Sequence, residues 1–250
     1  MITLKSPHEI ELMRRAGKIT AAARAFAGEM VKPGVTTQEI NHAVDHFIRK
    51  QGATPSFYHY YGYPASVCIS VNDEIIHGIP GKRVLQDGDI VSVDVGAYIG
   101  GYHGDCAATF PCGNVSPEAQ DLIHVTRQSF FEGIKFAKEG RRLYDISAAV
   151  QQYAESHGYS IVREYVGHGI GTEMHEPPEV PNFGHHGRGP RLLRGMTIAV
   201  EPMVNAGSAA IRQLSDGWTV KTLDGKWAAH YENTILITDG EPEILTAPAI

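Results

Sequence analysis

This chain of 250 residues has no long hydrophobic run and no concentration of positive charge. No apolar stretch approaches the roughly 18 residues of a membrane-spanning helix. The N-terminal stretch MITLKSPHEIELMRR lacks the apolar core of a secretory signal. The net charge of −6 is spread along the chain without a basic tract, which argues against nucleic acid as a direct partner. We therefore expect a cytoplasmic protein that does not enter the membrane.

Cysteine is also scarce, and the familiar catalytic motifs are missing. Cys68, Cys106 and Cys112 are irregularly spaced and form no CxxC pair, which favours a reducing compartment. Catalysis by one of them stays open from sequence alone. His175-Glu176 precedes two prolines and no second histidine, so there is no HExxH zinc helix. Neither a G-x-S-x-G elbow nor a Walker A loop is present.

What the chain does contain fits one folded domain over residues 1–250, since apolar residues make up 42% and charged residues 20%. Ser6, followed by Pro7 and Glu9, predicts a helix start, and Thr36 with Glu39 predicts a second one that ends at Gly52. Further helices are expected from Ser116 to about Gly140 and from about Tyr144 to Gly158. Strands are expected at 66–72, 90–96 and 105–112, with alternating strands and turns after Tyr159 and a glycine-rich loop at 184–195.

An internal repeat indicates two similar halves. Residues 31–52 align without gaps on 137–158, and the matches include Gly34 with Gly140 and Gly52 with Gly158. Each copy follows a helix that starts with Ser-Pro. A helix pair with an apolar stripe must cover a sheet. We therefore expect halves at about 1–113 and 114–250 that join their strands into one curved sheet, with the helices outside and a site at its concave centre.

Ionisable residues stand in or beside the most apolar strands, where an unpaired charge is costly. Asp94 lies within IVSVDV, Glu201 follows TIAV, and Glu232 precedes TILI. Asp105 follows a glycine-rich connection that would bring it beside Asp94 on a hairpin. Carboxylates gathered in this way would repel one another without a cation. With His168, held between two glycines, they form an oxygen-rich set that can bind two divalent ions, as in a two-metal hydrolase.

The ordered motifs IIHGIP, SVDVG, GGYHGDC, GHGIG, EPM and YENT cover nearly the whole chain, and together they resemble type I methionine aminopeptidase. The resemblance implies an α+β "pita-bread" fold with pseudo-two-fold halves, a curved antiparallel sheet covered by two helix pairs, and a dimetal site. It also implies removal of the initiator methionine from nascent proteins whose second residue is small. Because no N-terminal zinc-binding extension is present, the short bacterial form is the better match.

The same resemblance implies a role for each site residue. Asp94 would bind the first metal, Asp105 and Glu232 would bridge both metals, and His168 and Glu201 would bind the second. His175 would donate a hydrogen bond to the scissile carbonyl oxygen, His77 would lie near the scissile amide, and Glu201 would accept the proton of the attacking water. The methionine pocket would be lined by Tyr60, Tyr63, Cys68 and Trp218.

Two departures from the family pattern bear on pocket shape. Met174 stands where many members have an aromatic residue, and Phe57 and Tyr58 stand where some have small ones. The ligand set suits Mn²⁺, Fe²⁺, Co²⁺ or Zn²⁺. We expect a monomer that can contact the ribosome transiently. Two other readings remain: an Xaa-Pro peptidase with the same fold and metal pair, and a non-catalytic binding protein on this fold.

Overall fold

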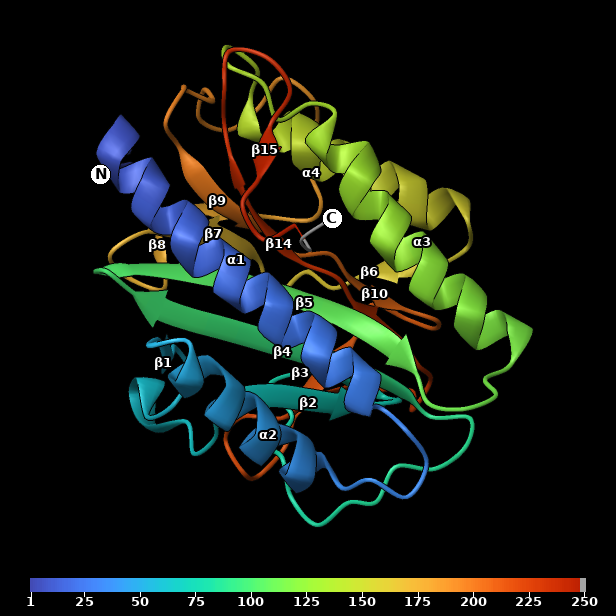
Figure 1. Ribbon diagram of the computed structural model, residues 1–250. Coiled ribbons are helices and arrows are strands. Elements are labelled where there is room, and N and C mark those ends of the chain that lie inside the picture. Colours follow the sequence, from blue (N-terminus) through green and yellow to red (C-terminus); the bar gives the residue numbers. More distant parts are fainter. Residues whose placement is uncertain (248–250) are drawn as a thin grey trace.

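A computed structural model describes residues 1–247 of the chain (Figure 1). It contains four α-helices and fifteen short strands arranged as two helix pairs around antiparallel sheets. The helices are α1 (Pro7–Met30), α2 (Thr37–Lys50), α3 (Pro117–Ile134) and α4 (Leu143–Ser156), with a single 3-10 turn at Tyr60–Gly62. None of these helices is long and apolar enough to cross a membrane. The predicted α+β class and helix pairs are confirmed.

Capping side chains set the helix starts as predicted. The Ser6 hydroxyl accepts a hydrogen bond from the backbone N–H of Glu9, and the Glu9 carboxylate accepts one from the Ser6 backbone N–H. Thr36 and Glu39 form the same reciprocal pair at α2. These bonds satisfy N–H groups that have no partner inside a helix.

The predicted end of the third helix was wrong. Helix α3 stops at Ile134, short of Gly140, and the chain continues in turns to α4. The backbone N–H of Gly140 donates to the Leu192 carbonyl, and the Leu192 N–H donates to the Arg141 carbonyl. This pairing with a segment distant in sequence replaces the last helical turns.

The strands form four hydrogen-bonded groups, and every strand pair is antiparallel. The first group contains β1 (Thr54–Pro55), β2 (Val67–Val71), β4 (Ile90–Ile99) and β5 (Tyr102–Pro111). The second contains β7 (Gly167–Gly169), β8 (Glu176–Val180), β9 (Thr197–Val200), β14 (Asn233–Leu236) and β15 (Glu243–Ile244). The third contains β6 (Ser160–Ile161), β10 (Met203–Asn205) and β13 (Ala228–His230). The fourth contains β3 (Glu74–Ile76), β11 (Ile211–Gln213) and β12 (Val220–Thr222).

The repeat seen in the sequence corresponds to matching structure. Helices α2 and α4 occupy equivalent positions in the alignment of 31–52 with 137–158, and both have 14 residues. Gly34 and Gly140 have φ values of 91° and 84°, in the left-handed region that favours glycine. Equivalent residues just before the two helices also form isolated bridges, Thr36 with Val84 and Arg142 with Arg191.

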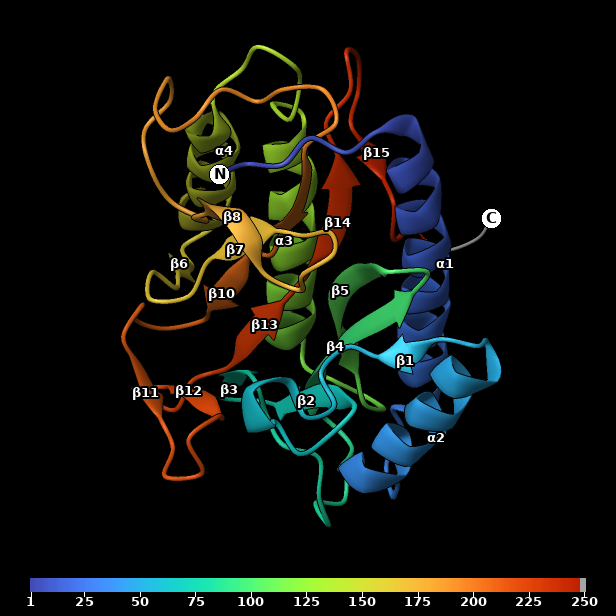
Figure 2. The same cartoon turned by 90° about the vertical axis from the view of Figure 1, so that its left-hand side faces the viewer.

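The two halves meet along a seam between β5 and the segment that enters β14. Ala107 and Glu232 exchange backbone hydrogen bonds of 3.3 and 2.9 Å across this seam. The buried guanidinium of Arg24, on α1, donates to both of their carbonyls and to the side chain of Asn233. Figure 2 shows β4, β5 and β14 between the α1–α2 pair and the α3–α4 pair. The seam thus fixes one half against the other.

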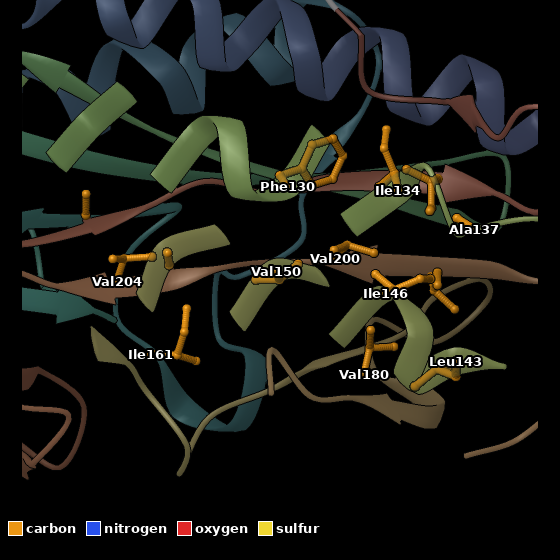
Figure 3. Close-up of a cluster of buried hydrophobic side chains, with 14 of the residues drawn as sticks. Phe130, Ile134, Ala137, Leu143, Ile146, Val150, Ile161, Val180, Val200 and Val204 are labelled. Atoms are coloured by element: carbon orange, nitrogen blue, oxygen red, sulfur yellow. The ribbon is translucent and has the colours of Figure 1, made fainter. Parts of the chain in front are cut away.

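The largest of the four clusters of buried hydrophobic side chains lies beneath α3 and α4. Phe130 from α3 and Ile146 and Val150 from α4 face Val200 and Val204 of the sheet, and all five side chains are buried (Figure 3). Burying such side chains stabilises the fold by about 1.5 to 3 kcal/mol each. This packing holds β9 and β10, which flank Glu201.

Candidate metal centre

Asp94 and Asp105 project from neighbouring strands of one hairpin. In this register Asp94 pairs with Ala107, and Gly96 pairs with Asp105, so both carboxylates lie on the same face, two positions apart. The hairpin is tighter than expected from sequence. Strand β4 runs on to Ile99 and β5 already starts at Tyr102, because Gly100 and Gly101 form the turn with φ values of 62° and 88°.

The second half contributes three further side chains. His168 lies in β7, Glu201 directly follows β9, and Glu232 directly precedes β14. The glycines beside His168 are required by close packing. A Cβ at Gly167 would lie 2.3 Å from the Ala199 carbonyl oxygen, and one at Gly169 would lie 2.2 Å from that of Pro177.

His168 presents a lone pair to the carboxylates. Its Nδ1–H donates to the Gly169 carbonyl oxygen at 2.8 Å, so the neutral ring has its lone pair on Nε2. Burial lowers the pKa of His168 to about 3, which keeps the ring neutral. Nε2 lies 3.6 Å from Asp105 Oδ2 and 3.7 Å from Glu201 Oε1. A hydrogen bond to the other ring nitrogen is typical of a metal-binding histidine.

The four carboxyl groups have too few hydrogen bonds and neighbouring cations to be stable in the ionised form on their own. Burial raises the pKa of Asp94 to about 7 and holds the pKa values of Asp105, Glu201 and Glu232 well above their usual range. One buried oxygen each of Asp94, Asp105 and Glu232 has no hydrogen-bond partner. Ligand atoms of Asp105, His168 and Glu232 lie within 4.8 Å of one another. Orphaned oxygens beside an imidazole lone pair fit a divalent cation.

One buried residue at this site was missed by the sequence analysis. His230, at the end of β13, lies with Nε2 3.7 Å from Glu201 Oε2 and 3.9 Å from Glu232 Oε2. Its position two residues before Glu232 places both side chains on one face of an extended segment. That spacing could have indicated it.

A cavity of about 300 Å³ opens onto the carboxylates. Tyr63 and Trp218 meet edge to face in its wall, with ring centroids 5.1 Å apart, and Phe57 and Met174 add apolar surface. Tyr58 lies outside it and is exposed. The cavity is lined by Phe57, Tyr60, Tyr61, Tyr63, Cys68, His77, Asp94, Asp105, His168, Met174, His175, Glu201, Trp218 and Glu232. All the residues predicted for the site therefore border one cavity.

His175, at the rim of the cavity, is oriented by Tyr60. The phenol oxygen lies 2.7 Å from His175 Nδ1. Burial raises the pKa of Tyr60 to about 12 and lowers that of His175, so the pair is a protonated phenol beside a neutral imidazole near pH 7. When the phenol donates to Nδ1, the ring proton lies on Nε2. That tautomer can donate a hydrogen bond to a substrate oxygen.

His77, which also lines the cavity, has a strained backbone. Its φ of 59° is left-handed, which is uncommon for a residue with a side chain. The ring meets Tyr165 and Trp218 edge to face. Burial lowers the pKa of His77 to about 4, so this imidazole is also neutral near pH 7. Strain of this kind is concentrated at functional sites.

The raised carboxyl pKa values predict how pH affects the metal-free protein. A carboxyl whose pKa is higher in the folded than in the unfolded state stabilises the fold while it is protonated. This stability is lost as pH rises through the folded pKa, which is about 7 for Asp94. The buried histidines have lowered pKa values, so their contribution to stability increases as pH rises, but only up to their ordinary pKa of 6.5. From pH 6.5 to about 8 we expect metal-free protein to lose stability on the order of 1 kcal/mol. Urea denaturation should show this loss, and saturating Mn²⁺ should abolish it; a flat profile without metal would contradict the prediction.

A buried ion pair holds the loop that carries His175. Lys5 Nζ lies 2.5 Å from Glu176 Oε2, and the two side chains are only 3% and 11% exposed. Removing one partner leaves a buried charge, so Lys5→Met is expected to cost about 3 kcal/mol or more in urea denaturation. The matched control is Lys138→Met, which breaks an exposed pair with Glu241 and should cost less than about 1 kcal/mol. Equal effects of the two substitutions would count against this account.

Comparison with known proteins places the chain in one family. The model of metallopeptidase family M24 matches residues 11–239. The chain belongs to metallopeptidase family M24. A methionine aminopeptidase from Clostridium perfringens is 56% identical over 98% of this chain and 99% of its own length. Methionine aminopeptidase 1 from Bacillus subtilis is 51% identical over 98% of this chain and 99% of its own length. Within the family, the chain belongs with the methionine aminopeptidases.

Solved structures agree. Methionine aminopeptidase from Thermotoga maritima superposes with a TM-score of 0.97 at 44% identity, covering 98% of this chain and 99% of that one. A prolidase from Pyrococcus furiosus shares the fold at a TM-score of 0.81, but at 22% identity and over 66% of its own chain. The predicted pita-bread fold is confirmed, and the Xaa-Pro enzymes are related at the level of the fold.

Proposed function

We propose that this chain is a metal-dependent aminopeptidase that hydrolyses the N-terminal methionine of proteins and peptides whose second residue is small. The observation that carries the proposal is the cavity of about 300 Å³ whose lining combines apolar and aromatic side chains with the carboxylate–histidine set. An unbranched thioether fits an apolar pocket. The full-length relatives at 51 and 56% identity are methionine aminopeptidases, which supports the same activity.

Two divalent ions would be held by five side chains. These would be Asp94 and Asp105 from the first half and His168, Glu201 and Glu232 from the second. The orphaned oxygens and the free Nε2 of His168 support this assignment. When bound, such ions lower the pKa of water and polarise a carbonyl oxygen. The ions would be Mn²⁺, Fe²⁺, Co²⁺ or Zn²⁺.

The chain's own residues then provide the proton transfers. Glu201 accepts the proton of the attacking water and passes it to the leaving amine; its carboxyl already has an affinity for protons that burial raises. His175 donates from Nε2 to the carbonyl oxygen, in the tautomer that Tyr60 supports. His77, which lines the same cavity, would lie near the scissile amide. Each of these groups is positioned before the substrate arrives.

The methionine side chain would lie against Tyr60, Tyr63, Cys68 and Trp218. All four line the cavity, and Tyr63 is held in place because its hydroxyl donates to the Gly78 carbonyl at 2.9 Å and lies 3.2 Å from the Val67 carbonyl. Phe57, which also lines the cavity, narrows this pocket. Nascent polypeptides are the proposed substrates. We further propose a monomer that acts in the cytoplasm and contacts the ribosome transiently; the resemblance to the family is the support for these four points.

A peptide panel tests the proposal. Metal-free protein is reconstituted separately with Mn²⁺, Fe²⁺, Co²⁺ and Zn²⁺, and release of the first residue is measured on Met-Ala-Ser, Met-Leu-Ser and Ala-Pro-Ser. We expect turnover of Met-Ala-Ser only with metal, with far less from the other two peptides. Preference for Ala-Pro-Ser would indicate an Xaa-Pro peptidase instead. Absence of turnover with every metal would indicate a non-catalytic binding protein.

A further inference from the structure

His230 is fixed at the back of the metal centre by the opposite half of the molecule. It pairs with Met203 at the end of β13 and is 2% exposed. Its backbone N–H donates to the Thr109 hydroxyl oxygen at 2.8 Å, and the Thr109 hydroxyl donates to its carbonyl at 2.9 Å. Thr109 itself contacts the Ser92 hydroxyl at 2.8 Å. The backbone of His230 is therefore held in place by the opposite half of the molecule.

The ring has a polar atom with no partner. Nε2 of His230 makes no hydrogen bond within the described part of the chain, although an unpartnered buried polar group typically costs about 1 to 3 kcal/mol. It lies 3.7 Å from Glu201 Oε2 and 3.9 Å from Glu232 Oε2. The other oxygen of Glu201, Oε1, lies 3.7 Å from His168 Nε2. The two oxygens of Glu201 thus face two different imidazoles.

We propose that His230 is a positioning residue of the metal centre. Its Nε2–H donates a hydrogen bond to Oε2 of Glu201, the carboxylate oxygen that faces away from His168. The inference rests on the proposed function, in which Glu201 binds metal through its ionised carboxylate. An ionised carboxylate accepts hydrogen bonds more strongly than a neutral one. The gap of 3.7 Å exceeds a hydrogen bond by less than 1 Å, and a small rotation of the Glu201 carboxylate would close it.

The arrangement gives the two histidines different tasks. His168 donates from Nδ1 to a carbonyl, so its Nε2 is a lone pair for metal. His230 presents Nε2–H instead, and its hydrogen bond to Oε2 fixes the orientation of the Glu201 carboxylate on the side away from His168. A ligating carboxylate with a hydrogen bond on its free oxygen is held in one orientation. Loss of such a partner typically weakens metal binding about 10- to 100-fold.

Two substitutions distinguish the hydrogen-bond donor of His230 from the space that its side chain fills. His230→Gln keeps an N–H close to the position of Nε2, whereas His230→Leu keeps the volume and removes the donor. Mn²⁺ affinity of the full chain is measured by isothermal titration at pH 7.5. We expect His230→Gln to bind within about 3-fold of wild type and His230→Leu to bind about 10- to 100-fold more weakly. The unfolding temperature of each metal-free variant controls for a loss of fold.

Several outcomes would overturn the inference. Wild-type affinity in His230→Leu would mean that His230 does not position the centre. Equal weakening in both variants, with a changed Co²⁺ absorption spectrum, would make His230 a direct ligand. If His230→Leu does not fold, ¹⁵N spectra of the Zn²⁺-loaded wild type decide, because the inference requires the proton of His230 on Nε2. Failure of the wild type itself to bind Mn²⁺ would instead refute the proposed function.

Discussion

Glu201→Gln is expected to lower kcat on Met-Ala-Ser by about 100- to 10,000-fold, the usual contribution of a positioned general base. The amide cannot accept the proton of the attacking water, and it removes one negative charge from the proposed ligand set. The side chain keeps its size, and only 12% of it is exposed, so the packing around β9 should persist. The measurement is steady-state turnover with saturating Mn²⁺.

Metal content must be followed in the same samples, since loss of the metal would imitate loss of the base. A matched control is Glu241→Gln, which changes an exposed surface glutamate paired with Lys138 and should leave turnover unchanged. Near-wild-type turnover by metal-loaded Glu201→Gln would exclude this residue as the base.

His175→Ala is expected to lower kcat by about 100- to 1,000-fold, as is typical when one donor to a developing oxyanion is lost. The effect should fall mainly on kcat, because the donated hydrogen bond strengthens as negative charge develops on the carbonyl oxygen. His175 lies at the rim of the cavity, so its removal should disturb the core little. Steady-state kinetics on Met-Ala-Ser separate kcat from KM.

Tyr60→Phe provides a comparison for this prediction. It removes the hydroxyl whose oxygen lies 2.7 Å from His175 Nδ1 but leaves the aromatic ring at position 60 and the imidazole of His175. We expect a smaller loss in kcat than that of His175→Ala, because the imidazole of His175 remains and only the hydrogen bond that selects its tautomer is lost. An increase in KM alone for His175→Ala would show that the residue binds the ground state and does not stabilise the transition state.

The sequence allowed much of this site to be predicted because its members stand in unusual local contexts. A carboxylate such as Asp94 within an apolar strand, or Glu201 at the end of one, needs a partner wherever it lies. The repeat of 31–52 in 137–158 predicted two similar halves, and the structure shows the equivalent helices α2 and α4. These signals are local or periodic, so they can be recognised without knowing the fold.

What could not be predicted depends on contacts between distant segments. The bond between Tyr60 and His175 joins residues 115 positions apart, and no local pattern around either residue indicates it. His230 had the spacing of a neighbour to Glu232, but its approach to Glu201 depends on how β10 and β13 pair. The early end of α3 has the same origin, since Leu192 competes for the backbone of Gly140.

The seam between the halves sets the order in which the enzyme can become active during its own synthesis. Ala107 and Arg24 leave the ribosome long before Glu232, whose backbone they bind. A growing chain can fold the β4–β5 hairpin early, yet it lacks the last proposed metal ligand until the segment entering β14 has emerged. Metal loading is therefore expected to follow synthesis of nearly the whole chain, so that a partly made enzyme stays inactive.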